Sequence, residues 1–336
     1  MKTNQTRVII IRCGALGDLV YATSVIDALK FQFGDNTIID FVSTPGSGTL
    51  FNTDNRINKV YPLKHKKVPI WLSSDKKKII KSSKDNPYDI LINFEYGKQF
   101  KSLFNAIEAK QKIDASDISI PKNIEHMVDM TKYIFKNIVS PKVFNKSFPR
   151  IIGTSKDKIK SQYNLNDNYI IVSPSNSHQK RNIINYRAWE NESWKQLIEK
   201  LSNEIQVVIV GNKGEDQFFD KLKPYPSGVI DLVGKTSLVD LIGVIDGATG
   251  LVATDTGTAH MASAVNTEVF ALIGPTPAKQ TGPYQSPTNK VHIISENLEC
   301  SPCYKTDTMW NCKDNICMKK ISVEKVFNTI VSAKLL

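Results

Sequence analysis

The chain has 336 residues, 41% of them hydrophobic and 23% charged, which is typical of a soluble globular protein and long enough for two domains of about 150 residues. No uncharged apolar stretch approaches the roughly 18 residues of a membrane-spanning helix, and the apolar run near the N-terminus is too short for a secretory signal, so we expect a cytoplasmic protein. The net charge of +11 favours an acidic partner, which could be nucleic acid, anionic lipid or a phosphorylated small molecule.

The first half of the chain alternates apolar runs with segments of helical periodicity. The predicted strands are residues 7–12, 36–42 and 88–95. Residues 19–33 carry apolar side chains at helical spacing and end before Gly34. This alternation predicts a parallel sheet covered by helices on both faces. Residues 140–168 lack strong periodicity and are the best candidate for a linker.

A lysine-rich stretch covers residues 59–84, with Asp75 as its one acid and Trp71 near its middle. Its lysines are Lys59, Lys64, Lys66, Lys67, Lys76, Lys77, Lys78, Lys81 and Lys84. A basic stretch with an embedded aromatic residue fits an anionic membrane surface or an acidic acceptor. The alternative is a solvated loop in a lysine-rich protein.

The strand–helix pattern starts again after the linker. The predicted strands are residues 169–175, 205–211, 250–254 and 268–274. Helical periodicity covers residues 193–201 and 237–245, and Ser237 with Asp240 predicts a capping box at the start of the second helix. The sequence therefore predicts an α/β fold with two successive doubly wound, Rossmann-like domains, at residues 1–150 and 151–336.

Ligands bind at the carboxyl ends of the strands in such sheets, so the loop after the first strand is a candidate site. In "RCGALGD", Gly14 and Gly17 match the second and third glycines of G-x-G-x-x-G, but Arg12 replaces the first glycine. That replacement weakens the hypothesis of a dinucleotide enzyme with Asp40 as the ribose-binding acid. Asp18 is then either a helix-capping residue or a general base.

A second candidate site is "DTGTAHMASAV", which follows the predicted strand 250–254. We expect Asp255 to cap the next helix and Gly257 to let the backbone approach a ligand. The amides of Thr256, Gly257 and Thr258 would then bind phosphate at the start of that helix, and His260 would add a donor. A capping aspartate beside a partly exposed histidine is the alternative.

Two further loops support a phosphate ligand. "SPSNSHQKR" supplies hydroxyls and Lys180, and "GNKGED" supplies glycines and Glu215. Three convergent loops fit a nucleotide diphosphate better than any one of them does.

"RVIIIRCGALGDLVYATSVIDAL", "DTGTAHMASA", "LIGPT", "TGPY" and "CSPC…C…CM" together resemble the ADP-heptose:lipopolysaccharide heptosyltransferases of glycosyltransferase family 9. The resemblance covers about residues 7–30 and 169–325. It implies a GT-B fold whose two domains face a central cleft, with the nucleotide sugar bound mainly by the C-terminal domain and the acceptor on the N-terminal side. It also implies inverting, metal-independent transfer of heptose from ADP-heptose to a lipopolysaccharide core-type acceptor, with no cofactor.

The implied partners are a nucleotide-sugar donor and a lipid-linked or anionic glycan acceptor, not nucleic acid. Peripheral contact with the cytoplasmic face of the inner membrane is also implied. The alternatives are a related enzyme for another nucleotide sugar or glycan acceptor, and a nucleotide-sugar-binding protein without turnover.

The resemblance also implies a role for individual residues. Asp18 corresponds to the base that deprotonates the acceptor, and Arg187 is an alternative to Lys180 as the phosphate-binding cation. The expected donor-binding residues are Gly14 at the phosphate, Lys180 at the phosphate, Glu215 at the ribose, Thr236 at the adenine, Asp255 at the sugar hydroxyls, and Thr256, Gly257 and His260 at the diphosphate.

A cysteine cluster lies near the C-terminus, at Cys300, Cys303, Cys312 and Cys317. The spacing allows one structural zinc ion bound by four thiolates. Disulfides and four reduced thiols are the two alternatives.

Overall fold

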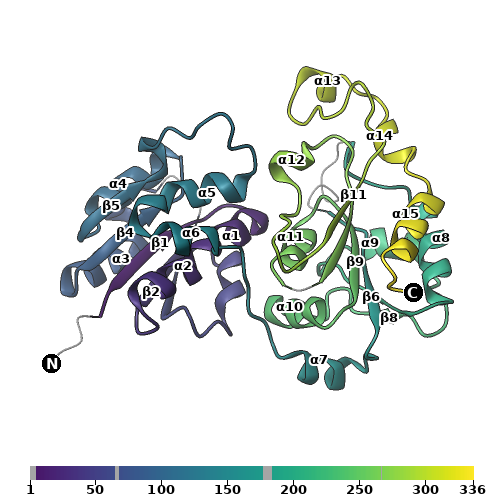
Figure 1. Ribbon diagram of the computed structural model, residues 1–336, viewed down its shortest axis with the longest axis horizontal. Coiled ribbons are helices and arrows are strands. Elements are labelled where there is room, and N and C mark those ends of the chain that lie inside the picture. Colours follow the sequence, from purple (N-terminus) through teal and green to yellow (C-terminus); the bar gives the residue numbers. More distant parts are fainter. Residues whose placement is uncertain (1–4, 65–67, 177–183, 266) are drawn as a thin grey trace. The chain divides into compact units, whose positions relative to one another are not determined.

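The structure, a computed structural model, describes residues 5–64, 68–176, 184–265 and 267–336. The chain divides into two compact units, Met1–Ile152 and Gly153–Leu336. Each unit is built around its own parallel sheet with helices on both faces (Figure 1). The boundary falls within the predicted linker 140–168, which also contains two short helices.

The first unit contains a five-stranded sheet in the order β3-β2-β1-β4-β5, and every adjacent pair is parallel. Its strands are β1 (Arg7–Ile11), β2 (Ile38–Ser43), β3 (Lys59–Pro62), β4 (Tyr88–Asn93) and β5 (Ala109–Asp114). Its α-helices are α1 (Leu16–Ala22), α2 (Ser24–Phe33), α3 (Ser74–Asp85), α4 (Lys98–Ala106), α5 (Met127–Phe135) and α6 (Pro141–Asn145). The lysine-rich stretch 59–84 therefore includes β3, the 3₁₀ turn η2 (Ile70–Leu72) and most of α3.

The prediction of a single helix over residues 19–33 is wrong in its bounds. Helix α1 begins at Leu16, and the helix is interrupted at Thr23 before α2 begins. The hydroxyl of Thr23 donates to Val20 O at 2.6 Å, and that of Ser24 donates to Tyr21 O at 2.8 Å. Such side-chain bonds to the preceding turn compete with the regular helical pattern. Thr23 Oγ1 also accepts a hydrogen bond from Arg150 N. This bond attaches the interruption between α1 and α2 to the last residues of the first unit.

Two layers of helices bury the first sheet. Helices α3 and α4 supply Ile79, Phe100, Leu103 and Phe104 to a core that includes Ile9 and other strand residues. Helices α1, α2 and α5 contact one another in the other layer. Buried apolar residues on both sides explain why the central strands have continuous apolar sequences.

The second unit contains a six-stranded parallel sheet in the order β11-β10-β9-β6-β7-β8. Its strands are β6 (Tyr169–Ser173), β7 (Gln206–Ile209), β8 (Ile230–Asp231), β9 (Gly250–Thr254), β10 (Glu268–Leu272) and β11 (Val291–Ile294). Its α-helices are α7 (Lys156–Tyr163), α8 (Asn191–Ser202), α9 (Asp216–Phe219), α10 (Leu238–Asp246), α11 (Gly257–Ser263), α12 (Ala278–Thr281), α13 (Asp307–Trp310), α14 (Ile316–Lys319) and α15 (Val323–Ser332).

The core of the second unit packs α8 and α15 against the sheet. Trp194, Leu197, Val326 and Ile330 are buried there with side chains from five strands. On the other layer, α10 contacts α7 and α11. The predicted cap of α10 is confirmed, since Ser237 Oγ accepts from Asp240 N at 3.2 Å and donates to its carboxylate at 2.7 Å. Among the described residues, no helix has the length and apolar character needed to cross a membrane.

Candidate active site

Asp18 lies in the first turn of α1, directly after the loop that follows β1. Its Oδ2 accepts a hydrogen bond from Ala15 N at 3.1 Å, so the carboxylate does cap the helix. Its Oδ1 lies 3.0 Å from an Arg12 guanidinium nitrogen. The Asp18 side chain nevertheless remains 36% exposed, so the carboxylate can still meet a ligand.

Arg12 is itself held by the loop that follows β4. It donates to Phe94 O at 2.7 Å and lies 3.7 Å from Glu95 Oε1. The same Glu95 oxygen accepts from Cys13 N at 2.6 Å, and its side chain is only 10% exposed. Glu95 therefore fixes the loop, whereas Asp18 faces solvent. The prediction from the sequence missed Glu95, although an acid directly after a buried strand was an available signal.

Because Gly14 has no side chain, the Asp18 carboxylate can occupy the space beside it. A Cβ atom at position 14 would lie 2.7 Å from Asp18 Oδ2 and 3.0 Å from Asp18 Cβ. Atoms do not approach that closely without a shift, so any side chain at position 14 would displace Asp18. The absence of a side chain at Gly14 therefore allows the observed position of the Asp18 carboxylate.

The alternative role for Asp40, as the ribose-binding acid of a dinucleotide enzyme, does not fit the structure. Asp40 lies within β2, is 1% exposed, and accepts hydrogen bonds from Tyr88 Oη and Asn58 Nδ2, both at 2.7 Å. Asp40 lies inside the strand and not in a loop beyond its carboxyl end, so it is not placed to contact a ribose.

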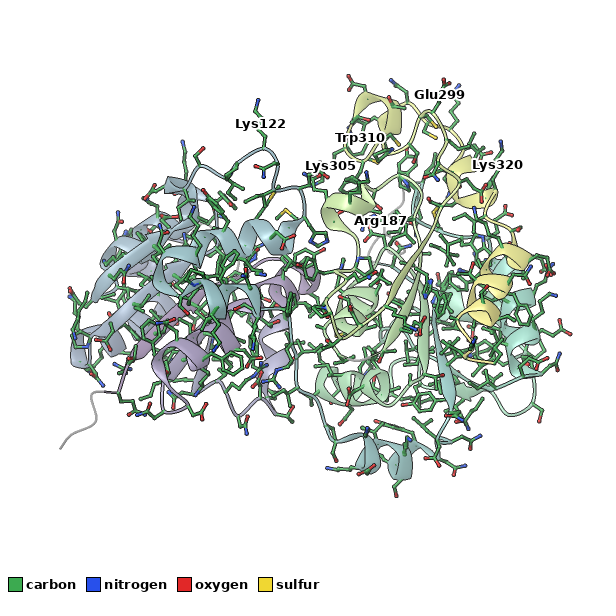
Figure 2. The ribbon with its side chains drawn as sticks, viewed as in Figure 1. Lys122, Arg187, Glu299, Lys305, Trp310 and Lys320 are labelled. Carbon is green, nitrogen blue, oxygen red and sulfur yellow. The ribbon has the colours of Figure 1, made fainter. Side chains whose placement is uncertain are left out.

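In the second unit, Asp255 follows β9 and its side chain is 8% exposed. Its carboxylate lies 3.4 Å from Arg187 Nε and 3.8 Å from His260 Nε2. Arg187 also stacks over the Tyr304 ring at 4.6 Å, and Figure 2 shows its position in this unit. The expectation that Asp255 caps α11 is wrong, because Thr256 is the N-cap residue. The Asp255 carboxylate instead faces Arg187 and His260.

Helix α11 begins at Gly257, two residues after Asp255. Thr258 Oγ1 lies 2.9 Å from Ser173 Oγ, which joins the start of α11 to the end of β6. His260 is 8% exposed and one turn into the helix. Thr256, Gly257 and His260 are thus gathered at the carboxyl end of β9, where the free amides of a helix start favour an anion.

The remaining predicted donor residues are spread over two loops. Glu215 is 6% exposed and accepts from Asn212 N at 2.9 Å and Asn212 Nδ2 at 3.2 Å, so its carboxylate stabilises the loop after β7. Thr236 is half-buried and precedes the N-cap residue of α10. Lys180 lies outside the described residues. The sequence suggests Arg187 only as a phosphate ligand, whereas in the structure it contacts Asp255.

The cysteines are free thiols. Among the residues that the structure describes, no group of three or more histidine, cysteine or acidic side chains is placed to hold a metal ion. Burial raises the pKa of Cys317 to about 11, and it also raises the pKa of Cys303. Cys303 N donates to Pro275 O at 2.9 Å, which ties the cysteine segment to the loop after β10.

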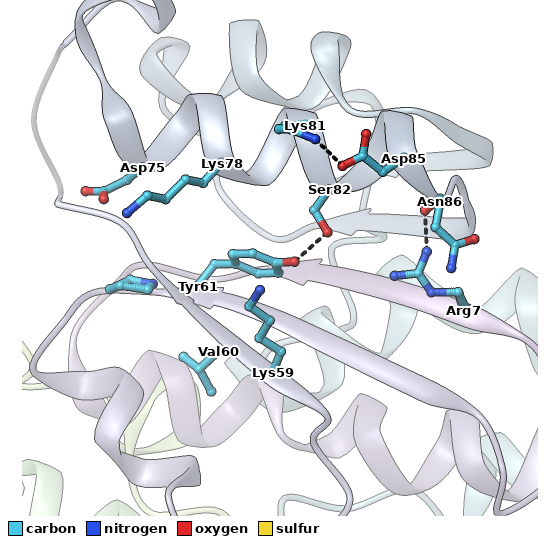
Figure 3. A pocket seen from close by; sticks show the side chains of 11 residues that line it. Arg7, Lys59, Val60, Tyr61, Asp75, Lys78, Lys81, Ser82, Asp85 and Asn86 are labelled. Atoms are coloured by element: carbon cyan, nitrogen blue, oxygen red, sulfur yellow. Dashed lines mark hydrogen bonds and ion pairs between the residues drawn. The ribbon is translucent and has the colours of Figure 1, made fainter.

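A groove of about 510 Å³ lies in the first unit between β3 and α3, apart from these residues (Figure 3). Lys81 pairs with Asp85 at 2.5 Å beside it, and Tyr61 Oη donates to Ser82 Oγ at 2.7 Å. None of the predicted site residues that the structure describes is in its lining. The lining residues are Arg7, Lys59, Val60, Tyr61, Pro62, Asp75, Lys78, Lys81, Ser82, Asp85 and Asn86.

Two Rossmann-like units with polar loops at the carboxyl ends of their strands define a doubly wound α/β protein, a class in which ligands bind at those ends. Residues 104–313 match the family model described as "Glycosyltransferase family 9 (heptosyltransferase)". The chain belongs to glycosyltransferase family 9, and it is therefore a glycosyltransferase. This membership confirms the resemblance found in the sequence, and the fold is of the GT-B class.

Several relatives and solved structures that are similar to this chain are heptosyltransferases. Lipopolysaccharide heptosyltransferase 3 of Escherichia coli is 24% identical over 287 residues, which cover 77% of this chain and 81% of that protein. The solved E. coli ADP-heptose lipopolysaccharide heptosyltransferase II has a TM-score of 0.76 at 17% identity and covers 98% of each chain. The iron-containing dodecameric heptosyltransferase TibC, solved with ADP-D-β-D-heptose, has a TM-score of 0.60 at 14% identity and covers 99% of this chain and 77% of that one.

Proposed function

We propose that this glycosyltransferase transfers a heptose, with inversion, from ADP-heptose to a lipopolysaccharide core-type acceptor. Family membership and the heptosyltransferase relatives support the class of reaction. The donor is inferred from two solved relatives, ADP-heptose lipopolysaccharide heptosyltransferase II and TibC with ADP-D-β-D-heptose. The observation that carries the proposal is the exposed Asp18 carboxylate, held by Arg12 and Ala15 in the loop after β1.

We assign Asp18 as the general base. In the transfer, the acceptor hydroxyl gives its proton to the carboxylate while its oxygen bonds to the anomeric carbon of the sugar. The bond from that carbon to the diphosphate breaks, and the nucleoside diphosphate leaves with the electron pair. Arg12 is a positioning residue because its contacts to Phe94 and Glu95 fix the guanidinium against Asp18.

We assign the donor to the second unit. The negative charge that develops on the leaving diphosphate would be stabilised by the amides of Thr256 and Gly257 and by His260. Asp255 would accept hydrogen bonds from the sugar hydroxyls, with Arg187 holding its carboxylate in place. Glu215 would receive the ribose and Thr236 the adenine, while Lys180 is proposed as a further phosphate ligand.

Two substitutions test the division between base and donor binding. Asp18→Asn should lower kcat about 10²–10⁴-fold, as expected for loss of a positioned base, while leaving the dissociation constant for ADP-heptose nearly unchanged. His260→Ala should instead weaken ADP-heptose binding, measured by isothermal titration calorimetry. Circular dichroism checks that both variants are folded.

The outcome distinguishes three possibilities. Near-normal turnover of folded Asp18→Asn would leave Asp18 as a capping residue only. Binding of ADP-heptose without any transfer by the wild-type protein would indicate a binding protein. If another nucleotide sugar stabilises the protein against heat more than ADP-heptose does, that sugar is the donor instead. A ligand at 100 times its dissociation constant adds about 2.7 kcal/mol to the free energy of unfolding.

A further inference from the structure

The carboxyl edge of the first sheet, where its parallel strands end, exposes large apolar side chains. Trp71 is 70% exposed, Leu72 is 60% exposed and Tyr96 is 58% exposed. Trp71 and Leu72 form η2, between β3 and α3, and Tyr96 follows β4. Large apolar groups gathered at one edge indicate a binding surface more often than isolated ones do.

The turn that carries Trp71 is fixed in place by a buried lysine. Lys76 is 3% exposed, and its Nζ donates to Val68 O at 2.7 Å and to Gln99 O at 3.3 Å. Ser73 caps α3 by accepting from Lys76 N at 3.2 Å. These bonds join the turn before α3 to the first turn of α4, so the exposed position of Trp71 is determined by the fold.

Exposed lysines lie on the same segments as these apolar residues. Lys64 follows β3, Lys77 lies in the first turn of α3, and Lys98 is the first residue of α4; all three are exposed. Lys81 and Lys101 have acidic partners, Asp85 and Asp114. Within the described part of the chain, Lys64, Lys77 and Lys98 form no ion pair. We call Trp71, Leu72, Tyr96, Lys64, Lys77 and Lys98 the Trp71 surface.

We propose that the Trp71 surface binds an anionic lipid bilayer. Tryptophan and tyrosine favour the membrane interface, where the ring is partly apolar and its polar group stays hydrated. Unpaired lysines around them complement the negative charge of anionic headgroups. An apolar centre with an unpaired cationic rim fits a bilayer better than it fits an acidic soluble partner, which would not need exposed Trp71 and Leu72.

The benefit of membrane binding to this protein rests on the proposed function. Asp18, the proposed base, also follows a strand at this carboxyl edge. A bilayer bound at the Trp71 surface would bring a lipid-linked acceptor to the edge that carries the base. The binding itself can be measured without donor or acceptor.

Vesicle flotation of the full-length protein provides the first measurement. Vesicles of phosphatidylethanolamine and phosphatidylglycerol should bind the protein, and vesicles of phosphatidylcholine alone should bind it much less. Each of Lys77→Gln and Lys98→Gln should weaken binding about fivefold, and added salt should weaken it further. Trp71→Ser with Leu72→Ser should weaken it more than tenfold.

Matched controls come from the second unit. Trp310→Ser removes a tryptophan that is 59% exposed on α13, and Lys221→Gln with Lys320→Gln removes two exposed lysines. These variants should bind vesicles as the wild type does. Figure 2 labels Trp310 and Lys320.

Fluorescence gives a second measurement. Of the four tryptophans, Trp189 and Trp194 are buried. In Trp310→Phe, the emission of the remaining exposed tryptophan, Trp71, should shift to the blue when anionic vesicles are added.

Several results would overturn the proposal. These are equal binding to neutral and anionic vesicles, undiminished binding by the Trp71→Ser and Leu72→Ser variant, and no blue shift. If that variant converts a dimer into a monomer in the absence of vesicle binding, the surface instead joins two copies of the chain. Transfer to a delipidated acceptor separates the two proposals, because losing the membrane surface should leave that activity intact.

Discussion

Among single residues, Gly14 matters because any side chain at position 14 would occupy the space of the Asp18 carboxylate. We expect Gly14→Ala to push the Asp18 carboxylate out of its position, because the added Cβ would lie 2.7 Å from Oδ2. Misplacing a catalytic group by about 1 Å can cost about 10²-fold in rate, so kcat should fall by roughly that factor. Steady-state kinetics measures the loss, and the thermal midpoint should change little.

Gly46 provides the matched control. It follows β2 in the same unit, and a Cβ atom there would have nothing within 4 Å. Gly46→Ala should therefore keep wild-type kcat. Equal activity of Gly14→Ala and Gly46→Ala would contradict the proposed importance of the Asp18 position.

Sequence reasoning proposed Asp18, Asp255 and His260 as site residues from their position after predicted strands, and in the structure all three follow strands. It could not find the contacts that orient them. Cys13 and Glu95 are 82 residues apart, and Arg187 is 68 residues from Asp255. Local patterns carry no information about pairs at such separation, which only the assembled sheet brings together.

At the scale of secondary-structure elements, Asp27 joins α2 to two arginines. Its carboxylate accepts from Arg56 at 3.0 Å and from Arg150 at 2.6 Å. Burial would raise the pKa of Asp27, but the hydrogen bonds from Arg150 and Arg56 outweigh it and lower the pKa. A lowered folded-state pKa means stability that is fully present above the unfolded value of about 3.9 and is lost as pH falls through the folded value.

We therefore expect Asp27→Asn to destabilise the first unit at neutral pH by about 1–3 kcal/mol, because two guanidinium groups lose their charged acceptor. The difference from the wild type should shrink as pH falls below about 4. Thermal unfolding at a series of pH values measures both effects.

Asp85→Asn is the control, since Asp85 and its partner Lys81 are 61% and 75% exposed. It should change stability by less than about 0.5 kcal/mol. A difference between Asp27→Asn and wild type that is the same at acid and neutral pH would contradict the assigned ionisation.

The central strands could be predicted from the sequence, but the edge strands could not. β1, β6 and β9 have continuous apolar sequences because helices cover both of their faces. β3 and β5 lie at the edges of the first sheet and contain lysines, and β5 exposes three consecutive residues. A short, charged edge strand has the same composition as a loop.

At the scale of the whole molecule, the cysteine segment supports the second unit. Cys303 bonds to the loop after β10, and a Cβ at Gly274 would lie 2.8 Å from Cys317 Sγ, so the two segments are closely packed. We expect Cys303→Ser to lower the thermal midpoint more than it changes the affinity for ADP-heptose.

We also expect treatment with a chelator to leave the transfer rate essentially intact.

Metal analysis of the purified protein provides the check. The iron described for TibC makes iron and zinc the metals to measure. One metal ion per chain whose removal abolishes transfer by a still-folded protein would overturn metal-independent transfer. A metal ion whose removal lowers only the thermal midpoint would assign the cysteines a structural role.

The two units are also continuous in the sequence, with one boundary after Ile152. All five strands of the first sheet are therefore synthesised before the second unit. Domains commonly fold during synthesis in the order of the chain. The second unit requires β11 and α15, near the end of the chain, to complete its sheet and core. A nascent chain that stops late would therefore carry a finished unit with Asp18 and an unfinished unit around Asp255, exposing apolar surface that quality-control proteases can recognise.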